Sequence, residues 1–170
     1  MSAAPDALPP TIPHLAAASA ARFGDAPAIL EAGECWSYAR LWDEARTAAS
    51  ALLARGVGLG DRIAIWAPNR REWIVAAIAA QAVGAAIVPL NTRLKAVEAT
   101  DILRRTRARL LFTVGDFLGT DYRAMLSGAD LPDLAAILCL DSDWAAFRAA
   151  GVAGDPRVDA ALAARTPDDV

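Results

Sequence analysis

The stretch GVGLGD, Gly56–Asp61, is where glycine spacing most suggests phosphate binding. A dinucleotide-binding loop needs glycines spaced G-x-G-x-x-G after a strand, so that the backbone N–H groups of the following helix reach the phosphates. Here the glycines follow a predicted helix and precede a predicted strand, and their spacing differs from that pattern. We therefore interpret this stretch as the end of a helix followed by a turn.

Residues that commonly act as bases, nucleophiles or metal ligands are scarce. His14 is the only histidine, and no serine lies in the G-x-S-x-G context of a hydrolase. One histidine and two distant cysteines, Cys35 and Cys139, provide no metal-ligand spacing. The sequence therefore predicts no catalytic residue and no metal site, and the cysteines are expected to be reduced thiols.

Four arginines form a basic run at positions 104, 105, 107 and 109. Single-stranded nucleic acids are bound by basic side chains that alternate with aromatic ones, and no aromatic residue lies within this run. A net charge of −3 also gives no general attraction to phosphate backbones. We expect a solvated helix face here and no nucleic-acid partner.

The uncharged stretch Trp73–Leu90 could be a membrane span or the interior of a soluble domain. Its length is marginal, because a helix that crosses a bilayer needs about 20 apolar residues. Gln81, Gly84 and Pro89 also interrupt it. We therefore expect no integral membrane segment.

The same stretch is better explained as a helix followed by a strand. Asn69 is a suitable helix cap, and Glu72 follows at the spacing of a capping box. The helix is predicted to end near Val83, and Ala85–Leu90 is predicted to be a strand. An apolar helix followed by a continuous apolar strand is typical of a parallel α/β sheet.

The remaining elements alternate in the same way. Ser37 is predicted to cap a helix, and Thr120–Leu126 is predicted to be helical. In another helix Val97 and Ile102 are predicted to face inward, with Leu103 as a further candidate. Strands alternating with helices predict an α/β fold with a doubly wound, mostly parallel sheet. The further predicted elements are helices at 13–22, 39–55, 96–107, 144–150 and 158–164, strands at 62–67, 109–114 and 135–140, and a hairpin of strands 28–31 and 34–37.

Composition sets the broad class of the protein. The chain has 170 residues, of which 55% are hydrophobic and 22% charged, which is enough for one domain with a sizeable core. Residues 1–10, rich in Pro and Ala, are predicted to be a flexible tail, and 11–170 the domain. The first residues lack the basic and apolar regions of a secretory signal, so the expected location is the cytoplasm.

Three sequence blocks resemble the N-terminal part of the adenylate-forming, AMP-binding superfamily, and acyl-CoA synthetases (fatty-acid–CoA ligases) in particular. The blocks are CWSYARLW (35–42), GDRIAIWAPNRREWIVAAIAAQAVGAAIVPLNTRLK (60–95) and RARLLFTVGDFLGTDY (107–122). The last block is similar to a narrower group of fatty-acid–CoA ligases, which includes some that act on propanoate side chains of steroid-derived rings. The resemblance runs from about residue 11 to 170 and implies an incomplete N-terminal region of that ligase fold.

The resemblance implies a two-step reaction. The family joins a carboxylate to ATP as an acyl-adenylate and then transfers the acyl group to CoA, so full-length members use ATP, Mg²⁺ and CoA. The family's phosphate loop ending in P-K-G, its magnesium-associated Glu, its ribose-binding Asp and its catalytic Lys come later than ARTPDDV, 164–170. We therefore expect an N-terminal ligase fragment that is cut off before the phosphate loop and that alone is inactive and has no cofactor. Its expected partner is the remainder of the ligase beyond Val170, in cis or in trans. The alternative is a non-catalytic α/β binding or partner module of a split ligase.

One binding residue is implied by the resemblance. In several CoA ligases the Arg of an N-x-R-L motif contacts the phosphate of the CoA nucleotide, and Arg93 occupies that place in NTRL. A guanidinium offers a planar fork of donors that suits a phosphate. The alternative is an ordinary solvated arginine in a strand-to-helix turn. The acyl substrate is not indicated, because the residues that shape the acyl pocket in relatives lie mostly beyond Val170.

Overall fold

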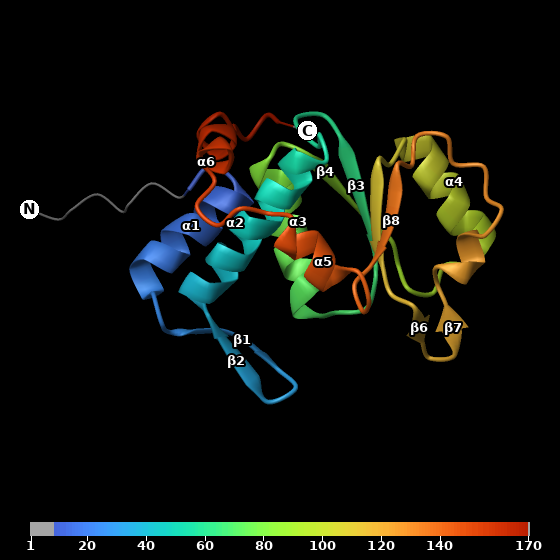
Figure 1. Ribbon diagram of the computed structural model, residues 1–170, viewed down its shortest axis with the longest axis horizontal. Coiled ribbons are helices and arrows are strands. Elements are labelled where there is room, and N and C mark those ends of the chain that lie inside the picture. Colours follow the sequence, from blue (N-terminus) through green and yellow to red (C-terminus); the bar gives the residue numbers. More distant parts are fainter. Residues whose placement is uncertain (1–8, 170) are drawn as a thin grey trace, which may run out of the picture.

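Helices and strands alternate along most of the chain (Figure 1). The computed structural model describes residues 9–169, so most of the predicted tail lies outside the described residues. The elements, in chain order, are α1 (Ile12–Phe23), β1 (Pro27–Glu31), β2 (Glu34–Ser37), α2 (Tyr38–Ala54), β3 (Arg62–Trp66), α3 (Arg71–Ala82), β4 (Ala86–Pro89), α4 (Ala96–Thr106), β5 (Leu110–Thr113), β6 (Asp116–Phe117), β7 (Thr120–Asp121), the 3-10 helix η1 (Ala124–Leu126), β8 (Ala136–Cys139), α5 (Trp144–Ala149) and α6 (Pro156–Ala163).

The central sheet has four parallel strands in the order β4-β3-β5-β8. The chain passes from β3 to β4 through α3 on one face of the sheet, and from β4 to β5 through α4 on the other face (Figure 1). The predicted α/β class and doubly wound parallel sheet are therefore confirmed. Because the strands are parallel, the loops that follow them meet at one edge, where α/β proteins commonly bind ligands.

The apolar stretch that begins at Trp73 forms α3 and β4, as predicted. Nearly every residue of α3 from Val75 to Ala82 is buried, because the helix lies between the sheet and a layer that contains α1, α2 and α6 (Figure 1). Its alanines allow those helices to approach closely. Within residues 9–169, no helix has both the length and the apolar character required to cross a bilayer.

The predicted cap of α3 is wrong by one residue. The helix begins at Arg71, and Arg70 occupies the N-cap without a side-chain capping bond. Glu72 does not complete a capping box with Asn69, because its carboxylate accepts a hydrogen bond from Arg70 Nε at 2.7 Å. The predicted cap at Ser37 is confirmed, since its Oγ accepts a hydrogen bond from the N–H of Arg40 at 3.2 Å.

Two predictions near α4 are also wrong. Thr120–Leu126 is not a helix: β7 pairs with β6, and only η1 is helical. Leu118 and Gly119 both have positive φ and form the tight turn between the two strands, which ends any helix there. Val97 is 82% exposed, so its predicted inward position is wrong, whereas Ile102 packs partly buried against the core and Leu103 is buried beside Ala99.

Pro89 lies on the open edge of the sheet. The N–H of Ala86 donates to the carbonyl of Asp61, just before β3, and the N–H of Leu90 donates to the carbonyl of Ile65 in β3. Because backbone N–H groups alternate in direction along a strand, those of the alternate residues in between point away from β3. The backbone nitrogens of Ile87 and Pro89 therefore point toward the open edge. A proline has no N–H to lose there, so it costs the sheet no ladder hydrogen bond.

The segment after β8 returns to α2 through a buried polar contact. Ser50 Oγ donates to Asp155 Oδ2 at 2.6 Å and accepts the N–H of Val152 at 3.0 Å. The Asp155 carboxylate also caps α6 and accepts from the Arg157 guanidinium at 2.7 Å. The bonds from Arg157 and then from Ser50 hold the pKa of Asp155 well below its ordinary value.

A lowered pKa predicts that this contact is sensitive to acid. The stability that Asp155 contributes is fully present above its unfolded pKa of about 3.9 and is lost as the pH falls toward the folded value. We expect Asp155→Asn to lower the melting temperature at pH 7 and to flatten its decline between about pH 5 and pH 2. Thermal melts across that range test this, with Asp130→Asn at an exposed position as the control that leaves the pH 7 melting temperature unchanged. An Asp155→Asn protein that loses stability in acid as steeply as the native chain would contradict it.

Candidate functional site

The loops after β3 and β4 enclose an open cavity of about 720 Å³ at the carboxyl edge of the sheet. Trp73 of α3 forms one wall, and the polar groups come from Asn69, Asn91 and Thr92. The lining residues are Ala67, Pro68, Asn69, Trp73, Pro89, Leu90, Asn91 and Thr92. This cavity stands where the fold commonly places a ligand.

Arg93 directly follows this lining. Asn91 Oδ1 accepts the N–H of Arg93 at 2.9 Å, and the N–H of Leu94 donates to the Asn91 carbonyl at 3.1 Å, so the loop is a tight turn. The Arg93 side chain is exposed, and within residues 9–169 its guanidinium has no hydrogen-bond or ion-pair partner. The predicted contact with a CoA phosphate stays a prediction, but the guanidinium is available for it.

Two buried aromatic side chains form hydrogen bonds with the loop that carries Arg93. The indole Nε1 of Trp66 donates to the Asn91 carbonyl at 3.0 Å, and the Tyr122 hydroxyl donates to the Thr92 carbonyl at 2.6 Å. The two rings meet edge to face, with centroids 4.7 Å apart. Sequence reasoning did not assign a site role to either residue, because no local pattern links them to a loop that lies 25 and 30 positions away.

An ionic network joins three loops at the same edge. Arg70 Nη1 pairs with Asp141 Oδ1 at 2.6 Å, and the N–H of Gly115 donates to Asp141 Oδ2 at 3.0 Å. Burial alone would raise the pKa of the Asp141 carboxyl, but the Arg70 guanidinium and the Gly115 N–H outweigh it and hold that pKa below its ordinary value. The charged Asp141 carboxylate therefore links the loops that follow β3, β5 and β8.

The other residues considered from the sequence have structural roles. Gly56–Asp61 is a turn at the amino end of β3, opposite the cavity, as interpreted. His14 Nδ1 bonds to Thr11 Oγ1 at 2.7 Å. Cys35 and Cys139 are both free thiols. Within residues 9–169, no group of three or more His, Cys, Asp or Glu side chains is placed to hold a metal ion.

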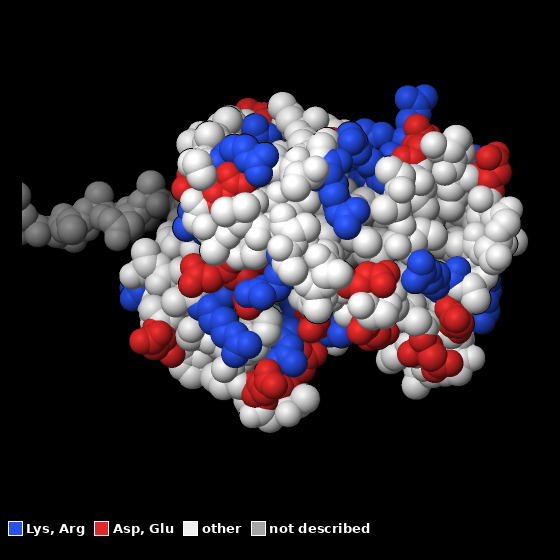
Figure 2. All heavy atoms as spheres, in the orientation of Figure 1, with Lys and Arg blue, Asp and Glu red and all other residues white. Residues whose placement is uncertain are grey.

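The basic run is divided among several contacts. Arg105 pairs with Asp101 at 3.6 Å on α4. Arg109, just before β5, pairs at 3.1 Å with Asp61, just before the neighbouring strand β3. Arg104 donates to the Asp130 carbonyl at 2.8 Å. On the face shown in Figure 2, basic and acidic side chains are interspersed rather than gathered by sign.

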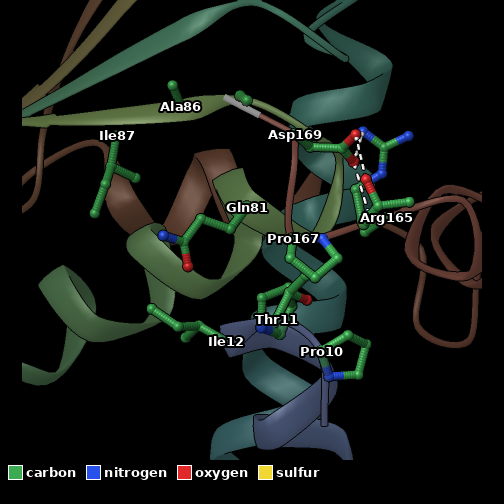
Figure 3. A pocket seen from close by; sticks show the side chains of 13 residues that line it. Pro10, Thr11, Ile12, Gln81, Ala86, Ile87, Arg165, Pro167 and Asp169 are labelled. Carbon is green, nitrogen blue, oxygen red and sulfur yellow. Dashed lines mark hydrogen bonds and ion pairs between the residues drawn. The ribbon is translucent and has the colours of Figure 1, made fainter.

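A second cavity, of about 330 Å³, lies where the start of α1, the end of α3 and the C-terminal segment meet beside β4 (Figure 3). Arg165, with a mostly buried side chain, pairs with Asp169 at 3.2 Å on its wall. A Cβ at Gly84 would displace the end of the Arg165 side chain, and the φ of +86° at this position strains any residue other than glycine. Gln81, Ile87 and other neutral side chains line the rest of it. The cavity was not foreseen, because it depends on contacts between both ends of the described chain.

Comparisons with known proteins agree with the fold and extend it. Residues 16–170 match the family described as AMP-binding enzyme. The chain is 43% identical over 151 residues to 3-[(3aS,4S,7aS)-7a-methyl-1,5-dioxo-octahydro-1H-inden-4-yl]propanoyl:CoA ligase of Mycobacterium tuberculosis, covering 86% of this chain and 30% of that protein. A ligase of the same name from Rhodococcus jostii is 35% identical over 175 residues, covering 95% of this chain and 34% of that protein.

Solved structures give the same result. The N-terminal domain of FACL13 from Mycobacterium tuberculosis superposes with a TM-score of 0.76 at 27% identity, covering 85% of this chain and 37% of that one. A Mycobacterium tuberculosis fatty acyl CoA synthetase has a TM-score of 0.77 at 27% identity, covering 86% and 30%. The chain thus spans about a third of the length of these relatives. It belongs to the AMP-binding enzyme family and corresponds to the N-terminal region of its acyl-CoA ligases.

Proposed function

We propose that residues 11–170 form part of the N-terminal domain of an ATP-dependent carboxylate–CoA ligase that works through an acyl-adenylate. The observation that carries this proposal is the 43% identity over 151 residues to the Mycobacterium tuberculosis propanoyl:CoA ligase. ATP, Mg²⁺ and CoA are the proposed cofactors of the assembled enzyme. The names of the two propanoyl:CoA ligases reported above make a propanoate side chain on fused rings the first substrate class to assay.

Arg93 is the residue of this chain that fits one of those cofactors. Among residues 9–169 its guanidinium has no partner, and at the carboxyl edge of the sheet it presents a planar set of donors that matches a phosphate of CoA. The described acidic side chains do not form a group suited to Mg²⁺, so no magnesium ligand is assigned. What this chain supplies is a phosphate contact and a rigid loop that orients it.

The 170 residues alone are proposed to be inactive and to bind no cofactor usefully. They include no Ser/Thr/Gly-rich loop that ends in P-K-G. The remainder of the ligase, beyond Val170 in cis or on another polypeptide in trans, is therefore the proposed partner. Two free thiols support a cytoplasmic location for the assembled enzyme.

A non-catalytic partner module of a split ligase is the second candidate function. The open edge of the sheet at β4 is compatible with a partner that packs beside it. The two candidates differ in chemistry, because a module would bind the remaining ligase segments in a fixed ratio without increasing acyl-adenylate formation.

The experiment is a pyrophosphate-release assay on the 170-residue chain and on the chain together with the remaining ligase segments, with ATP and the ring-linked propanoate. We expect no release from the chain alone and release from the assembled protein. Release by the chain alone would overturn its proposed inactivity. A complex of fixed ratio in which the chain adds no activity would favour the partner module.

In the assembled ligase, Arg93→Ala should raise the KM for CoA about 10- to 100-fold, because charge-assisted bonds contribute about 1.5–3 kcal/mol. The rate of acyl-adenylate formation should not change, since CoA enters after that step. Arg105→Ala removes another exposed arginine, away from the cavity, and should leave the KM for CoA unaltered. An unchanged KM in Arg93→Ala would refute the phosphate contact.

A further inference from the structure

We infer that Tyr122 is a positioning residue for Arg93, with Trp66 as the second support of the same loop. This inference rests on the proposed function, because Arg93 is the group whose position Tyr122 sets. Tyr122 lies in the connection between β7 and η1, far from the NTRL loop in sequence. It is 3% exposed, so its hydroxyl is a buried donor.

The need for these donors follows from where β4 ends. The N–H of Leu90 donates to the Ile65 carbonyl and closes the last ladder bond to β3. The next two carbonyls lie beyond the sheet. That of Asn91 accepts the N–H of Leu94 at 3.1 Å, whereas the described residues offer no backbone donor to that of Thr92. Tyr122 supplies the donor to the Thr92 carbonyl at 2.6 Å, and Trp66 adds a second donor to the Asn91 carbonyl at 3.0 Å.

The two donors hold each other in place. Their rings meet at an interplanar angle of 83°, and Thr113 Oγ1 donates to the Trp66 carbonyl at 3.0 Å. Phe117 packs beside the Tyr122 ring, with centroids 6.4 Å apart. Hydrogen bonds from side chains fixed in this way restrict the loop before any ligand arrives.

The placement of the bonds favours a role in binding over a role in packing alone. Both go to the two residues that directly precede Arg93, and the Asn91 side chain adds a third bond to the Arg93 N–H. The backbone that carries the Arg93 guanidinium is thus held at three successive residues. A ligand phosphate then meets a side chain whose base is already ordered, which lowers the entropic cost of binding.

Tyr122→Phe tests the inference, because it keeps the ring and removes only the hydroxyl donor. In the assembled ligase we expect the KM for CoA to rise about 5-fold, the equivalent of one neutral hydrogen bond. The kcat/KM with pantetheine, an acceptor that has the thiol but no phosphate, should be unchanged, as should the KM for ATP. Tyr38→Phe, at the only other tyrosine, should match the native enzyme in all three.

The double variant Arg93→Ala/Tyr122→Phe separates this inference from the proposed function. If Tyr122 acts through Arg93, the double variant should have the same KM for CoA as Arg93→Ala alone. If Arg93→Ala has no effect, the proposed phosphate contact fails, and the inference fails with it. If Arg93→Ala raises the KM but Tyr122→Phe does not, or if Tyr122→Phe impairs pantetheine equally, only the positioning role is overturned.

Discussion

Replacing Gly151 with alanine should lower the free energy of unfolding by about 3 kcal/mol, at the upper end of the usual cost of overpacking a core. Gly151 lies against the backbone of α2, where an added Cβ would overlap the Thr47 carbonyl oxygen. The same Cβ would lie 3.0 Å from the Thr47 carbonyl carbon and 3.2 Å from the Ala51 nitrogen. Backbone atoms within a packed helix cannot move aside as the end of a side chain can. The segment that carries α6 must therefore move away from α2.

Urea unfolding followed by circular dichroism measures this loss. Gly58→Ala is the matched control, because an added Cβ there meets open space. It should change the free energy of unfolding by no more than about 0.5 kcal/mol, as at other surface positions. If Gly151→Ala proved as mild as Gly58→Ala, the described contact between α2 and the segment after α5 would be wrong.

Phe112→Ala should cost about 4 kcal/mol, because it removes a large side chain from the centre of the core. Phe112 is fully buried in β5, and its ring meets those of Trp144 and Phe147 edge to face at 5.9 and 5.2 Å. Its loss would leave a cavity between the sheet and α5 and remove both aromatic contacts. The variant should unfold at a much lower urea concentration.

The control for this cavity is Val97→Ala on the outer face of α4. Val97 is exposed, and alanine favours helix more than valine does, so the change should be neutral or slightly stabilising. Equal effects of Phe112→Ala and Val97→Ala would mean that β5 does not lie at the centre of the core.

Local patterns predicted the elements well where each element depends on its own residues. The apolar stretch from Trp73 to Leu90 became α3 and β4, and the predicted hairpin of strands 28–31 and 34–37 formed β1 and β2. Its turn residues, Ala32 and Gly33, both have positive φ. Ser37 caps its helix, because a cap needs only the neighbouring N–H groups.

The predictions failed where a distant partner decides the local structure. Glu72 binds Arg70, and Arg70 also binds Asp141, which lies 71 positions away, so Asn69 does not cap α3. The chain around Tyr122 forms a hairpin and a single helical turn, and this places the ring against Trp66. At the candidate site, Arg93 was proposed from its motif and stays a prediction, whereas Trp66 and Tyr122 could be connected to its loop only in three dimensions.

Pro89 also affects how the sheet meets other molecules. The open side of β4 presents the N–H of Ile87 and then a proline ring where the next outward donor would stand. A strand from a second copy could not form a continuous ladder there, and such interruptions are how natural sheets avoid aggregation by edge-to-edge pairing. The residue that ends β4 and leads the chain toward Arg93 therefore also protects this edge from self-association.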